Sequence, residues 1–272
     1  MTSTRPAELI YWINERESMR LRRATGKPLE EHGWSANPDM GTVRYCNVHR
    51  EDDKVTQWLA EHWRPLHHQP WEIVLARMVN YIPTLELLLS QEVFKYEDPL
   101  AQGVAPVMKV LRADGHKIWT AAYTISTCGQ AVDKIDYVMD VVRASMPIQT
   151  LDLSTLSQSH TLLQGVKGLG SFLAAQVVAD LKNTKGHPLE QAPDWATWAA
   201  HGPGSLAGLS AYFGKPVTPT TFRAYLTLCW QDVRSSVPEM HMQDFQNCMC
   251  EFSKYVRVKE GGHARNRYTA TA

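Results

Sequence analysis

The feature that most constrains the fold is a glycine-rich turn near the middle of the chain. Residues 162–181 read Leu-Leu-Gln-Gly-Val-Lys-Gly-Leu-Gly-Ser-Phe-Leu-Ala-Ala-Gln-Val-Val-Ala-Asp-Leu. Gly165, Gly168 and Gly170 permit a tight turn and a close approach of the backbone. Apolar residues then recur at helical spacing and predict a packing face, made of Phe172, Ala175, Val178 and Ala179. The segment therefore predicts two helices joined by a short hairpin.

The start of the second predicted helix is suited to binding a phosphate. Amide N–H groups at a helix N-terminus point toward an anion, and Lys167 in the turn adds a positive charge. We therefore expect the hairpin to bind duplex DNA, and a plain helical turn is the alternative. Dinucleotide-binding folds also use Gly-x-Gly, but here no strand is predicted before it and no Gly-x-Gly-x-x-Gly is completed.

Helical periodicity dominates the rest of the chain. It predicts helices over residues 7–24, 52–63, 71–89 with an interruption at Pro83, 134–146, 222–233 and 240–255. Residues 117–125 fit either a strand or a buried helix. Because strand signals are few, we expect a mainly α architecture. It forms a single domain over 1–272, or two helical subdomains, 1–147 and 148–272, that meet near Pro147.

Composition excludes several classes of protein. No stretch of about 20 apolar residues occurs, and the polar start of the chain lacks the apolar core of a signal peptide, so we expect a cytoplasmic protein without a membrane span.

The five cysteines are scattered, and Cys248-x-Cys250 lacks the partners of a zinc site. Formal net charge is zero, so a basic signature for nucleic acid exists only in local clusters such as Arg265 and Arg267.

Several further segments, taken in order, carry a resemblance. They are Arg44-Tyr-Cys-Asn-Val-His-Arg-Glu-Asp-Asp53, Gly202-Pro-Gly-Ser-Leu-Ala-Gly-Leu209, Gln246-Asn-Cys-Met-Cys-Glu-Phe-Ser-Lys-Tyr255 and Arg265-Asn-Arg-Tyr268. Together with the hairpin and Pro193-Asp-Trp195, they resemble the phage amino acid:DNA transferases, also called α-glutamyl/putrescinyl-thymine pyrophosphorylases. The chain is also similar to the helical domain of some 5-hydroxymethyluracil DNA kinases, and its hairpin resembles that of the HhH-GPD DNA glycosylases.

This resemblance implies a helix-hairpin-helix, glycosylase-like helical fold and a step in the hypermodification of phage DNA. An amine would displace the phosphate or pyrophosphate of phosphorylated 5-hydroxymethyluracil in double-stranded DNA. The co-substrate would be an amino acid such as glycine, or a polyamine. No Gly-x4-Gly-Lys-Ser/Thr motif occurs in the chain, so the upstream DNA kinase would be a separate protein, and both would act in the host cytoplasm.

The resemblance also suggests catalytic residues. The glycosylase superfamily places a catalytic Asp shortly after the hairpin, where this chain has Asp194, which we expect to act as the general base. Asp194 could instead cap a helix that begins at Trp195. The lysine of lyase-type members is replaced here by Phe172, which argues against Schiff-base chemistry. Glu251 and Lys254 are the second candidates for catalysis.

Displacement of a phosphate from a flipped base also needs cations near the leaving group. For binding the leaving group or substrate we select polar residues of two segments: Arg44, Asn47, Arg50, Asp52, Asn247 and Tyr255. The alternatives are that Asp52 and Asp53 cap the following helix and the arginines pair with them, and that the 247–255 face is solvent-exposed. Arg265 and Arg267 could hold DNA phosphates or the donor carboxylate. A divalent metal could assist, but the sequence shows no ligand set.

Two other functions remain open at this point. A DNA glycosylase would use Asp194 to excise a base. A non-catalytic DNA-binding subunit of a modification complex would need the hairpin alone. Arg44, Arg50 and Glu251 separate these functions from the transferase, because a non-catalytic subunit needs no buried polar cluster and a glycosylase needs no phosphate clamp.

Overall fold

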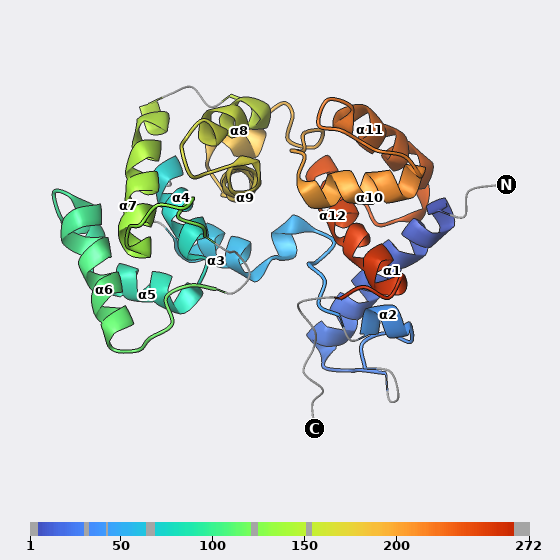
Figure 1. The fold of residues 1–272 in the computed structure, drawn as a ribbon, viewed down its shortest axis with the longest axis horizontal. Helices are drawn as coiled ribbons and strands as arrows, with labels where there is room; N and C mark the ends of the chain where they lie inside the picture. The colour runs from blue at the N-terminus through green and yellow to red at the C-terminus, as the bar shows by residue number, and fades with distance from the viewer. Residues whose placement is uncertain are drawn as a thin grey trace. The chain divides into compact units, whose positions relative to one another are not determined.

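The structure is a computed structural model that describes residues 5–29, 33–41, 43–63, 69–120, 125–150 and 154–263. Within these ranges the regular structure is helical (Figure 1), and an isolated antiparallel bridge pairs Leu29 with Gly33. The mainly α class expected from periodicity is therefore confirmed. None of the described helices combines the length and apolar character needed to cross a membrane.

The chain folds into two compact units, and one of them is discontinuous in sequence. The terminal unit combines Met1–Asp53 with Ala196–Ala272, and the inserted unit is Lys54–Trp195. The sequence left open a single domain or a division near Pro147. That position lies inside the inserted unit, where α7 (Lys134–Ser145) continues directly into the turn η4 (Met146–Thr150). Because both elements pack against α4 (Pro70–Val79), no boundary separates them.

The terminal unit brings helices from both ends of the sequence together. Its described elements are α1 (Arg5–Thr25), α2 (Pro38–Gly41), η1 (Arg50–Asp52), α10 (Pro203–Phe213), α11 (Phe222–Val233), η6 (Arg234–Ser236) and α12 (Met242–Lys259). In Figure 1, α1 in blue and α12 in red lie side by side. The sequence predicted α11 with the observed bounds and α12 to within a few residues.

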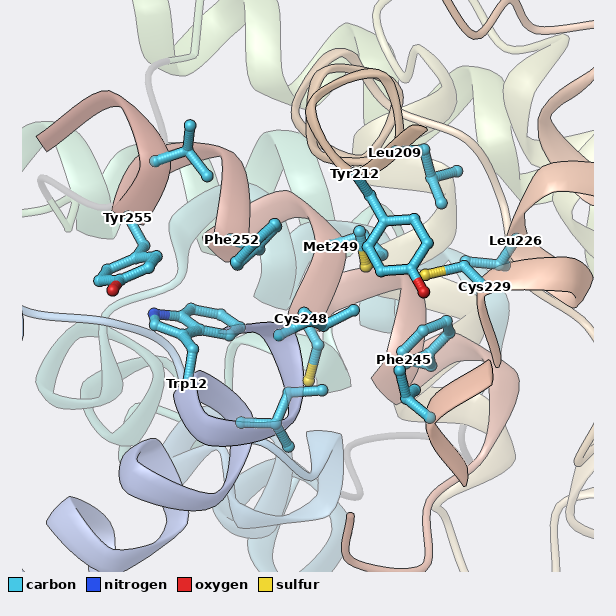
Figure 2. Packing of buried hydrophobic residues seen from close by; sticks show 14 of the residues in the cluster. Trp12, Leu209, Tyr212, Leu226, Cys229, Phe245, Cys248, Met249, Phe252 and Tyr255 are labelled. Atoms are coloured by element: carbon cyan, nitrogen blue, oxygen red, sulfur yellow. The ribbon is translucent and has the colours of Figure 1, made fainter. Parts of the chain in front are cut away.

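Aromatic side chains fill the contact between α1 and α12. The Trp12 ring lies 5.5 Å from the ring of Phe252 and 6.0 Å from that of Tyr255 (Figure 2). All three residues are buried, and burial raises the pKa of the Tyr255 phenol. Tyr255, which was expected in the substrate site, packs in the core because its helix turns this face toward Trp12.

Two glycines let α10 approach α12 closely. A Cβ atom placed on Gly208 would lie 1.9 Å from the backbone oxygen of Met249, and one on Gly204 would lie 2.3 Å from the sulfur of Cys250. The Met249 oxygen belongs to the backbone of a packed helix and cannot move aside easily. The contact between these helices therefore requires glycine at position 208.

The inserted unit consists of short helices around α4 and α9. Besides α4, α7 and η4 its described elements are α3 (Lys54–His62), α5 (Ile82–Ser90), η2 (Val93–Lys95), η3 (Pro99–Val104), α6 (Ala105–Ala113), α8 (Leu156–Gln164), α9 (Ser171–Lys182) and η5 (Pro188–Gln191). The interruption expected at Pro83 occurs three residues earlier. Asn80 ends α4 with a left-handed backbone, and Pro83 lies in the first turn of α5, where its missing N–H costs nothing.

A buried ion pair connects three helices of this unit. Arg77 of α4 bonds to Asp180 of α9, and both side chains are almost fully buried. Thr56 of α3 accepts a hydrogen bond from Arg77 at 2.6 Å and donates one to Asp180 at 2.9 Å. Arg77 also donates to Asn80 at 3.0 Å. Loss of one partner would leave an uncompensated buried charge, so this network fixes how the helices pack.

The glycine contact gives a test of the fold. We expect Gly208→Ala to lower the free energy of unfolding by at least about 1–3 kcal/mol, because the added methyl group forces α10 and α12 apart. Urea denaturation followed by circular dichroism measures this change. Ala207→Ser adds one heavy atom on the exposed side of the same helix and should change stability by less than about 0.5 kcal/mol. Equal stability of the two variants would contradict the packing described here.

Candidate active site and nucleic-acid interface

Four of the predicted site residues lie on one irregular stretch of the terminal unit, residues 43–53, here called the anchored segment. They are Arg44, Asn47, Arg50 and Asp52. Apart from the short turn η1, the segment has no regular structure, so its backbone groups lack the partners that a helix would supply. Side chains of α1 and α12 provide these partners instead.

Arg16 of α1 is the central anchor. Its guanidinium donates to the backbone oxygens of Cys46 and of Asn47, the latter at 2.9 Å, and to the sulfur of Cys248 at 3.3 Å. It also lies 4.5 Å from the centre of the Trp12 ring. The residue is only 4% exposed. Hydrogen bonds to a charged donor are each worth about 1.5–3 kcal/mol, so Arg16 holds the segment firmly against α1 and α12.

One face of α12 completes the anchoring. Asn247 donates to the oxygen of Asn47 at 3.2 Å, and Lys254 donates to the oxygen of Arg44 at 3.0 Å. Glu251 accepts a hydrogen bond from the amide of Cys46 at 3.2 Å. The sequence spacing placed Asn247, Glu251 and Lys254 on one face. In the structure this face packs against the anchored segment, so the alternative of a solvent-exposed face is wrong.

Glu251 and Lys254 form an ion pair within this face. Lys254 Nζ lies 2.7 Å from Glu251 Oε2 and 5.2 Å from the centre of the Tyr45 ring. Glu251 is buried. Burial of the Tyr45 phenol raises its pKa, and the nearby charge of Glu251 raises it further. Oε1 of Glu251 has no hydrogen-bond partner within the described ranges. This carboxylate therefore retains one oxygen that can accept a proton.

Arg50 presents unused donors. Its amide donates to Asp244 Oδ1 at 2.8 Å, and its Nη1 lies 3.8 Å from Asp53 Oδ2. Its Nε and Nη2 are buried and have no hydrogen-bond partner among the residues that the structure describes. A buried donor left unpaired costs about 1–3 kcal/mol, and more when it is charged. Such a guanidinium is suited to receiving the oxygens of an anion.

The other predicted residues of the segment have structural partners. Asp52 lies 3.2 Å from Arg20 Nε, and its backbone oxygen accepts a hydrogen bond from Asn47 at 2.7 Å. Arg44 is exposed. The expected alternative, that the segment's arginines pair with its carboxylates, holds for Arg50 and Asp53.

A group of possible metal ligands also lies in the terminal unit. Ligand atoms of His49, Glu51 and Asp244 all lie within 4.8 Å of one another. No sequence pattern indicated this group, because Asp244 is almost 200 positions away from the other two. Two of its members do, however, belong to the dense polar run that drew attention to the anchored segment.

The predicted hairpin is present in the inserted unit as α8, a turn over residues 165–170, and α9. Leu169 is fully buried and fixes the turn. Gly168 has φ +101°, and a Cβ there would lie 2.5 Å from a methyl group of Val141 on α7. His160 of α8 contacts the backbone oxygen of Ser171 at 3.0 Å. The turn is therefore held by packing and by a polar contact between its two helices.

The start of α9 exposes a charged and an apolar side chain. Lys167 is exposed in the turn, as a phosphate contact requires. Phe172 was expected on the packing face of α9, but it is 51% exposed. The expectation was wrong because Phe172 lies in the first turn of the helix, before the buried face that begins at Ala174. Gly165 and Gly170 flank Lys167 and complete the predicted turn.

Asp194 performs a capping role that differs from the predicted one. The helix expected to begin at Trp195 does not form, since residues 195–197 make a turn. Asp194 instead accepts hydrogen bonds from the amides of Leu156 at 2.8 Å and Ser157 at 3.0 Å. It thus caps the N-terminus of α8, 38 residues earlier. Each of its oxygens accepts one amide, and it connects the end of the inserted unit to the hairpin.

Two predicted residues, Arg265 and Arg267, lie outside the described residues. Their expected contacts with DNA phosphates or a donor carboxylate remain predictions.

The comparison with known proteins agrees with part of the resemblance. A family model described as "5-hmdU DNA kinase, helical domain" matches residues 4–264. No curated protein and no solved structure matches the chain. Because the family model spans nearly all of the 272 residues, the protein belongs to the family of the helical domain of 5-hmdU DNA kinases.

Proposed function

We propose that the protein is a DNA-modifying transferase that replaces the phosphate or pyrophosphate of phosphorylated 5-hydroxymethyluracil with an amine. Membership of its family links the chain to the modification of 5-hydroxymethyluracil in DNA. The observation that supports a transfer step is the buried guanidinium of Arg50, whose Nε and Nη2 lack partners within the described part of the chain. A phosphoryl oxygen would satisfy these donors.

The reaction forms one bond and breaks one. The amine nitrogen attacks the methylene carbon on C5 of the base, and the bond between that carbon and the phosphate oxygen breaks. The leaving group departs with the electron pair, and the nitrogen loses a proton to a base. An amino acid such as glycine, or a polyamine, would supply the amine. A separate kinase would supply the phosphorylated DNA.

Charge develops on the oxygen of the leaving group as the carbon–oxygen bond breaks. A cation fixed beforehand stabilises that charge without reorganising, which is the largest single contribution in many enzymes. Arg50 is fixed because its amide is bonded to Asp244 and its segment is anchored by Arg16. We therefore assign to Arg50 the binding of the leaving group, with Arg44 as an exposed second cation.

We assign the proton acceptor to Glu251. Its Oε1 has no hydrogen-bond partner in the described ranges, whereas both oxygens of Asp194 accept amides of α8. The adjacent Lys254 keeps the Glu251 charge balanced. Asp194, the base that the resemblance implied, then positions the hairpin for DNA, and a direct test below separates the two roles.

Nucleoside mass analysis tests the activity directly. Duplex DNA that carries phosphorylated 5-hydroxymethyluracil is incubated with the protein and a pool of amino acids and polyamines, then digested. We expect a new nucleoside whose mass equals an amine adduct, which also identifies the donor. Abasic sites would mean a glycosylase, and unaltered DNA that still binds would mean a non-catalytic subunit; either result overturns the proposal.

Arg50→Gln provides the matched variant for this assay. Because Gln removes the charge that stabilises the leaving group, we expect a loss of turnover of about 10²-fold or more with the fold retained. Arg234→Gln changes an exposed arginine of the same unit and serves as the control. Equal activity of the two variants would remove Arg50 from the leaving-group site.

Asp194→Asn and Glu251→Gln separate capping from catalysis. We expect Glu251→Gln to lower turnover at least 10²-fold while DNA affinity stays close to that of the wild type, since general-base catalysis contributes about 10²–10⁴-fold. Asp194→Asn retains an acceptor for one amide, so its turnover should fall less, and its Tm should fall because a cap is weakened. If Asp194→Asn instead lowered turnover more than Glu251→Gln, Asp194 would be the general base.

Lys167→Glu tests the hairpin as the DNA contact. The slope of log affinity against log salt concentration should become shallower by about 0.9, the value for one phosphate contact on duplex DNA, and binding should weaken at every sequence. Fluorescence anisotropy at several salt concentrations measures the slope. Lys185→Glu makes the same charge change at an exposed site beyond α9 and should leave the slope unchanged. Identical slopes for wild type and Lys167→Glu would exclude this contact.

A further inference from the structure

The strongest unassigned feature of the terminal unit is the meeting of one imidazole and two carboxylates. His49 and Glu51 flank Arg50 on the anchored segment, and Asp244 lies in the first turn of α12. Their ligand atoms lie within 4.8 Å of one another. Neither the His49 ring nor the Glu51 carboxylate has another hydrogen-bond or ion-pair partner in the described part of the chain, so both are available to a ligand.

Asp244 is the member of this group that hydrogen bonds hold in a fixed position. The residue is 1% exposed, and its two oxygens accept amides of Arg50 at 2.8 Å and His241 at 3.0 Å. A carboxylate offers about four lone-pair positions, so these two bonds leave capacity for a metal ion. Arg50 lies between His49 and Glu51 in the chain. The hydrogen bond from the Arg50 amide to Asp244 therefore holds the backbone where both neighbouring side chains lie close to the Asp244 carboxylate.

The spacing suits one ion after a small movement. Two ligand atoms bonded to one ion at roughly 2.0–2.2 Å are at most about 4.4 Å apart when they are opposite, and about 3 Å when adjacent. His49 is partly buried, and Asp244 is held by its bonds. The exposed side chain of Glu51 is the member that can rotate to close the set.

The mixed donors select the kind of ion. Imidazole nitrogen favours first-row transition ions, whereas Mg²⁺ and Ca²⁺ prefer sites made of oxygen alone. One nitrogen and two carboxylate oxygens leave further coordination positions for water or a substrate oxygen. Two carboxylate charges balance a divalent ion, and Arg50 is itself offset by Asp53 at 3.8 Å.

We propose that His49, Glu51 and Asp244 form a binding site for a first-row divalent cation such as Mn²⁺, open on its remaining side to a phosphate oxygen. The cation site follows from the three ligands and the bonds that hold Asp244. The phosphate partner rests on the proposed function. In that case the cation and the unpaired donors of Arg50 would bind oxygens of one leaving group, which assigns the phosphoryl end of the substrate to this part of the terminal unit.

Binding of Mn²⁺ alone to the full-length protein is the test. Free Mn²⁺ gives a six-line electron paramagnetic resonance signal that is lost on binding, so titration yields affinity and stoichiometry without DNA or amine. We expect one site per chain and an affinity at least tenfold lower for His49→Gln and for Glu51→Gln. The control variants His263→Gln and Glu260→Gln alter an exposed histidine and an exposed glutamate of the same unit and should bind as the wild type does.

The outcomes are distinct. Loss of affinity in both ligand variants, with Tm unchanged, supports the site. Absence of stoichiometric Mn²⁺ binding by the wild type, or equal binding by ligand and control variants, overturns it. Asp244→Asn is less informative, because that side chain also caps α12. Because no substrate is present, a failure here leaves the amine-transfer proposal standing, and a failure of amine transfer leaves the metal site standing.

Discussion

The terminal unit depends on one constraint, which is that an irregular stretch of backbone must be satisfied by side chains. Apart from the turn η1, residues 43–53 have no regular structure of their own where they pack against α1 and α12. Arg16 binds the oxygens of Cys46 and Asn47, and α12 contributes Asn247, Glu251 and Lys254. Polar residues that the sequence suggested as catalytic or substrate-binding groups therefore also hold Arg50 in place.

Local features of this fold could be predicted from the sequence because local periodicity encodes them. Apolar spacing alone located α11, and the glycines at 165, 168 and 170 located the turn between α8 and α9. The spacing of Asn247, Glu251 and Lys254 also identified a shared face. In each case the physical cause, a helical repeat or a turn that needs glycine, acts within a few residues.

Features that depend on distant partners could not be predicted in this way. Asp194 caps a helix 38 residues before it, and Asp244 meets His49 and Glu51 across almost 200 positions. No periodic signal reports such pairs. The exposure of Phe172 was missed for a related reason, since helical spacing does not show where along α9 the buried face begins. Whether a polar residue has a structural or a catalytic role therefore depends on contacts between residues that are distant in sequence.

The discontinuity of the terminal unit has a consequence for synthesis of the chain. During translation, α1 is made before the inserted unit, but α10, α11 and α12, which pack on α1, follow only after it. All residues of the inserted unit are available before these helices are made, and domains generally fold as units during synthesis. Until the C-terminal helices are made, Trp12 and Ile13 of α1 lack the helices that bury them in the folded unit. Nascent chains stalled before α10 should therefore be the form most dependent on chaperones.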